Sequence, residues 1–172
     1  MGVGLLRPDL VGANIASLQQ DGTLELATWA MSSTWLFSLT ILVVNAGGMS
    51  LVNLLLPSAI VPFAGIALFA YWAFDTGVTL APVNDVAALT MIPHSLTVLI
   101  EFQAYVLVLL GAYRLGMSWL RPRTVGARNR RQGYLRGLRQ VGWLSLPALA
   151  LLVVGAIYEA IEILHLVPLL LS

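Results

Sequence analysis

The chain contains five ionisable residues inside stretches that are otherwise apolar: His94, Glu101, Glu159, Glu162 and His165. The clearest case is Glu101, which lies well inside the apolar run 91–116 (MIPHSLTVLIEFQAYVLVLLGAYRLG). Such a run can cross a bilayer, because a helix needs about 20 apolar residues to do so. A charge near mid-membrane costs on the order of 3 kcal/mol, so these residues are candidate functional groups that face protein or water.

Carboxylates and imidazoles at these positions are compatible with three kinds of chemistry. They can be neutral or hydrogen-bonded groups that fix helix packing, for example through Tyr105 and Tyr158. They can line a passage for protons, ions or a substrate. A third reading is a metal site of Glu and His ligands, since Glu-x-x-His spacing serves that chemistry in helix bundles, but a second such motif is lacking. No nucleophile and base stand at a catalytic spacing, so we predict no catalytic residues, no bound metal and no cofactor.

The composition predicts a membrane protein. Of the 172 residues, 59% are hydrophobic and 10% are charged, and the mean hydropathy is +0.87. A soluble domain of this length has about a quarter charged residues. We therefore predict one all-α integral membrane domain, a polytopic bundle of about four transmembrane helices. Cysteine is absent, which excludes disulfides, thiolate metal ligands and thiol catalysis.

The basic residues are all arginines, and all but Arg7 lie between Arg114 and Arg139, where no acid is found. Basic residues that flank membrane helices accumulate on the cytoplasmic side, so this segment is predicted to be cytoplasmic in a bacterial inner membrane. The arginines predicted to set the topology and to touch lipid head groups are Arg121, Arg123, Arg128, Arg130, Arg131, Arg136 and Arg139. The run is too short to form a nucleic-acid-binding fold, so no nucleic acid is expected.

Hydropathy and breakers predict four parts in order: an interfacial segment over 1–25, helices one to three over 26–119, a basic loop over 120–140, and a last helix with its tail over 141–172. Residues 1–22 lack the pattern of a removable signal peptide, so the first membrane helix is expected to direct insertion. The third helix is predicted from about Pro93 to Trp119. The last is predicted from about Val141 to His165, with Pro168 ending it.

Two positions are open for the turn between helices one and two. One is Asn45–Gly48 and the other is Pro57–Pro62, since both contain helix breakers. We favour Asn45–Gly48, because Trp29 and the pair Tyr71 and Trp72 then lie at the same membrane interface.

On this topology, two carboxylates lie at similar depth in the outer half of the membrane. Glu101 stands about 10 Å below His94 on the third helix, and Glu159 stands about 9 Å below His165 on the last. Glu159, Glu162 and His165 recur every three residues and so share one broad face. We therefore expect the ionisable groups to converge in one place.

Four elements together cover about the C-terminal half of the chain: Ile92–Ser95, Glu101–Gly116, the Arg-rich loop and Ala156–Ile161. These elements resemble the stage II sporulation protein M family of bacterial and archaeal membrane proteins. Ser95 stands where the family usually has glycine. The resemblance implies a membrane scaffold that gathers partner proteins, with Glu101 and Glu159 as the family's membrane carboxylates.

The sequence therefore predicts a non-enzymatic integral membrane scaffold or accessory subunit. Its expected partners are the lipid bilayer, other integral membrane proteins and further copies of itself. The alternative is a permease-like transport component, such as a subunit of an exporter driven by a separate ATPase, with Glu101 and Glu159 lining the passage.

Overall fold

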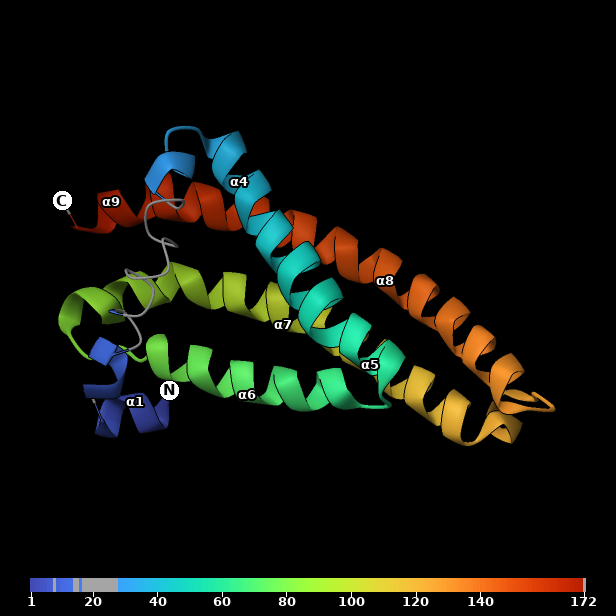
Figure 1. Cartoon of the computed structure of the whole chain (residues 1–172). Coiled ribbons are helices and arrows are strands. Elements are labelled where there is room, and N and C mark those ends of the chain that lie inside the picture. Colours follow the sequence, from blue (N-terminus) through green and yellow to red (C-terminus); the bar gives the residue numbers. More distant parts are fainter. Residues whose placement is uncertain (8, 14–15, 17–27, 172) are drawn as a thin grey trace. The chain divides into compact units, whose positions relative to one another are not determined.

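A computed structural model describes residues 1–7, 9–13, 16 and 28–171, and all regular secondary structure in this part of the chain is helical (Figure 1). The all-α prediction is therefore confirmed for these residues. Of the predicted interfacial segment over 1–25, residues 1–7, 9–13 and 16 are described, and the rest of it, with residues 26 and 27 at the start of helix one, lies outside the described residues. The helices are α1 (Gly2–Leu6), α4 (Thr34–Leu42), η1 (Val43–Leu55), α5 (Leu56–Ile60), α6 (Ala64–Thr79), α7 (Asp85–Leu120), η2 (Pro122–Val125), α8 (Arg130–Ile161), η3 (Glu162–Leu166) and α9 (Val167–Leu171).

Three helical runs are long and apolar enough to cross a membrane: Thr34–Ile60, Asp85–Leu120 and Arg130–Leu171, with 27, 36 and 42 residues. At about 1.5 Å per residue, even the shortest spans about 40 Å, more than the hydrocarbon core of a bilayer. Helix α6 has 16 residues and is shorter than these runs. The class predicted from composition, a helical protein with membrane-crossing segments, agrees with these lengths.

By packing, the chain falls into two compact units, each described by itself below. Unit 1 comprises Met1–Ile41, Tyr71–Val98 and Gly155–Ser172, and unit 2 comprises Leu42–Ala70 and Leu99–Val154.

The first turn lies at Val61–Phe63 and not at Asn45–Gly48, so the preference for the latter position was wrong. Asn45–Gly48 is helical within η1. A turn there would leave amides and carbonyls exposed to hydrocarbon, whereas a continuous helix bonds them internally. Val61 is extended, with φ −128° and ψ 120°, because the ring of Pro62 disfavours a helical residue before it. Phe63 then reverses the chain with φ 68°.

Helix α7 begins at Asp85, eight residues before the predicted start. Asn84 caps it, since the Asn84 Oδ1 accepts a hydrogen bond of 2.8 Å from the Ala87 N–H. Pro93 consequently lies inside the helix and not in its first turn. Pro93 lacks the N–H that would bond the Leu89 carbonyl, and proline is tolerated inside membrane helices where neighbouring groups compensate. The Tyr158 hydroxyl donates to the Pro93 carbonyl at 3.3 Å, which links α8 to this part of α7.

The basic connection is shorter than the predicted loop over 120–140, because α8 begins at Arg130. The Gln132 N–H donates to the Asn129 Oδ1 at 2.9 Å, and the Gln132 Oε1 accepts from the Arg128 N–H at 3.1 Å. This reciprocal pair caps the start of the helix, so the first ten residues of α8 are helical although they are polar.

The last helical run continues past Pro168 to Leu171, so the expectation that Pro168 ends it was wrong. The preceding segment η3 is π-helical, and the Val167 N–H bonds the Glu162 carbonyl. Pro168 therefore lies inside a continuous helical run, just after this π-helical segment.

Glycines allow the helices of unit 2 to pack closely. A Cβ on Gly65 would lie 1.8 Å from the Leu54 carbonyl oxygen, and one on Gly133 would lie 2.1 Å from the Ser118 carbonyl oxygen. The Tyr134 hydroxyl donates to the Ala59 carbonyl at 3.1 Å. The turn at Val61–Phe63 and the start of α8 therefore lie at the same end of unit 2.

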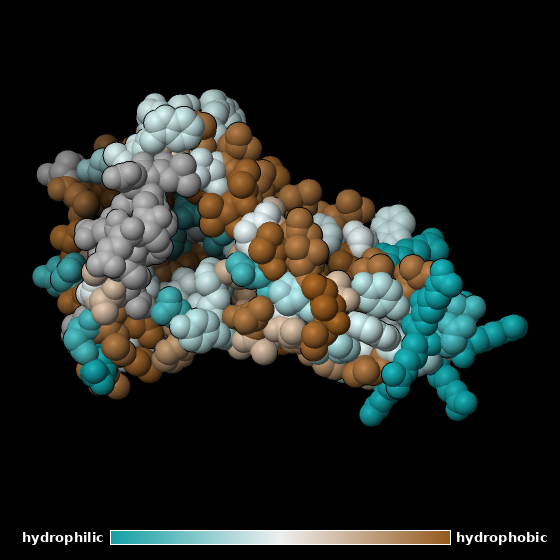
Figure 2. Space-filling model, viewed as in Figure 1, coloured by the Kyte–Doolittle hydropathy of each residue, from teal (hydrophilic) through white to brown (hydrophobic). Residues whose placement is uncertain are grey.

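Long hydrophilic side chains gather at one end of unit 2. Figure 2 shows them where α7 and α8 are joined, with hydrophobic side chains over much of the rest of the visible face. In unit 1, small apolar contacts hold the elements together, with Ala30 and Phe37 packed against Ala160.

Candidate functional site

The first polar cluster, in unit 2, consists of Asn45, Glu101 and Tyr105. The Asn45 Nδ2 donates to the Glu101 Oε1, and the Tyr105 hydroxyl donates to the Asn45 Oδ1 at 3.0 Å. The Asn45 side chain thus bridges a carboxylate and a phenol, because its Nδ2 bonds Glu101 and its Oδ1 bonds Tyr105. Tyr105 is 1% exposed, and its ring packs on Phe69 with centroids 5.3 Å apart.

The second polar cluster, in unit 1, is built around Glu162. This carboxylate is 1% exposed. It accepts a hydrogen bond of 2.5 Å from the Thr97 hydroxyl on one oxygen and contacts the His94 Nδ1 at 3.2 Å with the other. Thr97 is also 1% exposed, whereas the His94 side chain is 19% exposed. The cluster is a buried carboxylate held by one hydroxyl and one imidazole.

The remaining ionisable residues of the membrane segments have separate partners. His165 Nε2 lies 3.2 Å from the Thr34 hydroxyl. Glu159 is half-buried in α8 and takes part in an interaction as well.

Both clusters depend on π-helical segments. Asn45 lies in η1 and Glu162 opens η3. In η1 the Ser50 hydroxyl donates to the Asn45 carbonyl at 2.9 Å, a bond between residues five apart. A π turn contains one more residue than an α turn and so rotates the following side chains to a different face, and such turns are frequent at functional sites.

One pair of the ionisable groups that were predicted to converge is in contact. The structure brings His94 and Glu162 together across 68 positions of sequence. Glu101 belongs to the other unit and is bonded to Asn45. Thr97 was missed by the sequence analysis, and Asn45 was interpreted as a turn residue. Both residues could have been recognised as candidates from the sequence, since each is a polar side chain in an apolar stretch.

The contacts define what these groups can do chemically. In the described part of the chain, no buried side-chain nitrogen or oxygen lacks a hydrogen-bond partner. No group of three or more metal-ligating His, Asp or Glu side chains occurs among the described residues. The carboxylates are therefore acceptors within hydrogen-bond networks, and the contact between His94 and Glu162 joins two groups that can exchange a proton.

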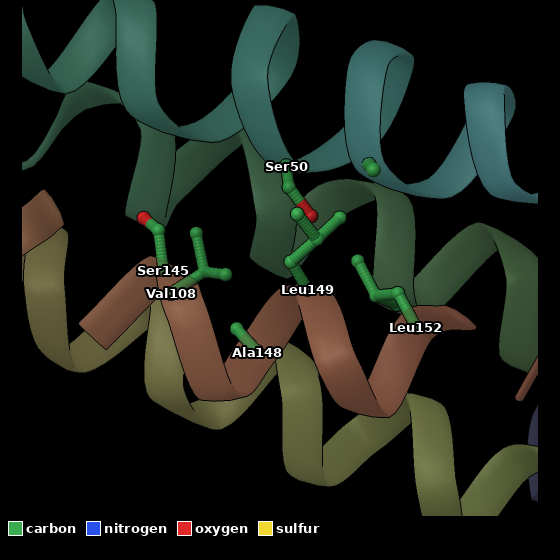
Figure 3. Close-up of a pocket in the computed structure, with 7 residues that line it drawn as sticks. Ser50, Val108, Ser145, Ala148, Leu149 and Leu152 are labelled. Atoms are coloured by element: carbon green, nitrogen blue, oxygen red, sulfur yellow. The ribbon is translucent and has the colours of Figure 1, made fainter. Parts of the chain in front are cut away.

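A cavity of about 130 Å³ lies beside the first cluster's helices in unit 2. Figure 3 shows Ser50 of η1 facing Leu149 and Leu152 of α8 around it. Its lining is mostly apolar, and neither Glu101 nor Asn45 belongs to it. A cavity with such a lining favours apolar contents over water.

The seven arginines predicted to contact lipid lie on the connection after α7 and on the first turns of α8, and all are exposed. Within the described residues, the bond from Arg136 Nη1 to the Val125 carbonyl, at 2.6 Å, is the one hydrogen bond made by any of their side chains. Their charge therefore has no carboxylate partner among the described residues.

Comparisons with protein-family models, with curated proteins and with solved structures found no match to this chain. The resemblance to the stage II sporulation protein M family stays a prediction.

Proposed function

We propose that this chain is an integral membrane scaffold or accessory subunit whose intramembrane polar groups hold its own helices together. The observation that supports this most directly is the bridging of Glu101 by Asn45, with Tyr105 on the other side of the same amide. Groups that are bonded to one another inside the chain serve to fix helix packing in lipid. The second cluster has the same character, since Thr97 bonds Glu162.

The proposed topology has four membrane segments, with α6 as the second and with both ends of the chain outside. The arginines after α7 would face the bacterial cytoplasm, as their charge favours. The turn at Val61–Phe63 lies at the same end of unit 2, which supports an even number of crossings between these two connections. The resemblance to the stage II sporulation protein M family, carried by Glu101–Gly116 and Tyr158–Ile161, also supports a scaffold.

The test is capture of partners from native membranes. The chain is crosslinked in cells, solubilised in mild detergent and purified, and the co-purifying membrane proteins are identified. We expect specific partners that are also retained by Glu101→Gln, because glutamine keeps the oxygen that accepts from Asn45. Recovery of the chain alone after crosslinking would contradict the proposal.

A transport component is the second candidate, and the contact between buried Glu162 and His94 favours it. A carboxylate and an imidazole in contact inside a membrane are typical of proton relays. The test uses the purified protein in vesicles loaded with a pH-sensitive dye, under a potassium diffusion potential. If protons enter the vesicles, and if Glu162→Gln and Glu101→Gln abolish this entry while the protein still assembles, the chain is a transport component and not a scaffold.

A further inference from the structure

Unit 2 contains a second cavity, of about 330 Å³, beside the arginine-rich connection. Helix α7 contributes Arg114 and Ser118 to its lining, the connection contributes Thr124, and α8 contributes Gln140. Its volume lies within the range of small-molecule sites, which is about 300–1,000 Å³.

Two polar side chains of this lining make no hydrogen bond with the described residues: the Arg114 guanidinium and the Gln140 amide. The Thr124 hydroxyl already donates to the Arg121 carbonyl at 2.8 Å. Ser118 adds a hydroxyl to the lining and is 1% exposed. Arginine, amide and hydroxyl donors around one space match the oxygens of a phosphate group.

The charge of unit 2 points to the same ligand. Eight arginines and one carboxylate, Glu101, lie in this unit, and Glu101 is bonded to Asn45. The ion pairs found among the described residues join Arg7 to Asp9 and His94 to Glu162, so none involves these arginines. The positive charge of unit 2 therefore exceeds its negative charge, and an anion from outside the chain would balance it.

The wall of the cavity is held in place by the connection itself. Arg136 bonds the Val125 carbonyl, and the Ala127 N–H bonds the Pro122 carbonyl at 2.9 Å. Gly126 closes this turn with φ 67°, in the left-handed region that favours glycine. The cavity is thus bounded by a bonded turn and two long helices.

An aromatic pair follows the lining in sequence. Trp119, the residue after Ser118, packs edge to face on Tyr134 with centroids 5.2 Å apart, and such aromatic residues collect at membrane interfaces, where lipid head groups lie. Tyr113 and Met117 add an apolar side to the lining. We propose that this cavity binds the phosphate of an anionic membrane lipid, with Arg114 as its main ligand and Gln140 and Ser118 as further donors. This inference does not depend on the scaffold or transport role.

The test measures lipid binding to the full-length protein in nonionic detergent by native mass spectrometry. Phosphatidylglycerol, phosphatidylcholine and inorganic phosphate are the three probes. Arg114→Gln is compared with Arg7→Gln, which removes the same charge from an exposed residue outside both the cavity lining and the arginine cluster. Gln140→Leu is the second variant at the cavity, and circular dichroism verifies that each variant keeps its helix content.

We expect phosphatidylglycerol to bind more tightly than phosphatidylcholine. Arg114→Gln should weaken this binding about tenfold, the loss typical of one charge-assisted hydrogen bond. Gln140→Leu should weaken it about threefold, as for one neutral hydrogen bond, and Arg7→Gln less than about twofold. Equal losses in Arg114→Gln and Arg7→Gln, or no preference for phosphatidylglycerol, would overturn the site. If inorganic phosphate at the same concentration as the lipid displaces phosphatidylglycerol, the ligand of the cavity is a free phosphate and not a lipid head group.

Discussion

Thr97 and Glu162 lie 65 positions apart in sequence, and the hydroxyl of the first donates to the carboxylate of the second at 2.5 Å, with both side chains 1% exposed. A bond of this length to a carboxylate is a strong one. It joins α7 to the start of η3 inside unit 1, and it places the Glu162 carboxylate beside His94.

Thr97→Val tests the contribution of this bond, because valine keeps the shape of the side chain and removes the hydroxyl. The free energy of unfolding should fall by about 1–3 kcal/mol, since the buried Glu162 oxygen loses its donor. Thermal unfolding in detergent measures the change. Thr90→Val in the same helix is the matched control, because the Thr90 hydroxyl bonds only the nearby Ala87 carbonyl. Equal losses in the two variants would contradict the prediction.

Asn45→Leu tests the first polar cluster. Removing the amide leaves the Glu101 carboxylate and the Tyr105 hydroxyl without this partner, so the free energy of unfolding should fall by about 2–4 kcal/mol. Asn53→Leu, at an exposed position of the same π-helix, should change it by less than about 1 kcal/mol. An Asn45→Leu variant as stable as the wild type in a detergent melting experiment would show that the bridge does not hold the helices.

Gly65→Ala should disrupt the hairpin between α5 and α6. Its Cβ would meet the Leu54 backbone, and backbone cannot move aside as a flexible side chain can. We expect a loss of about 2 kcal/mol or more, or failure to fold. Gly48→Ala is the control, because nothing lies within 4 Å of an added Cβ there. Alanine at Gly48 is expected to be neutral or to stabilise the helix slightly.

The topology can be tested with single cysteines, since the native chain has none. A cysteine replacing Arg128, which is exposed on the connection after α7, should react with a membrane-impermeant maleimide only after the cells are permeabilised. A cysteine replacing Val83, on the connection before α7, should react in intact cells. The reverse pattern would contradict a cytoplasmic arginine cluster.

Arg7 and Asp9 form an exposed ion pair outside the membrane-crossing segments. The hydrogen bond from Arg7 lowers the pKa of Asp9 below its usual value, and the charge of Arg7 adds to the effect. A lowered pKa contributes stability at pH values above the unfolded-state pKa, and this contribution is lost as the pH falls through the folded-state pKa. Arg7→Gln should raise the pKa of Asp9, as an NMR titration of the carboxyl carbon would show.

The sequence by itself determined the features that depend on local composition. The long apolar runs predicted membrane-crossing helices, and the separation of arginines from acids follows directly from the order of residues. His94, Glu101 and Glu162 were recognised as candidates because a polar group in an apolar run is conspicuous without any knowledge of its neighbours.

Only the tertiary structure decided which of these groups meet and where the chain turns. The sequence around Asn45 is typical of a turn, yet Asn45 lies in the helix η1, where its backbone groups are bonded within the helix. Its side chain bonds Glu101, which is 56 positions away in sequence. The two π-helical segments rotate side chains off the faces that a 3.6-residue period predicts. The pairing of Thr97 with Glu162 therefore depends on how the helices pack, and the spacing of residues along a single helix does not predict it.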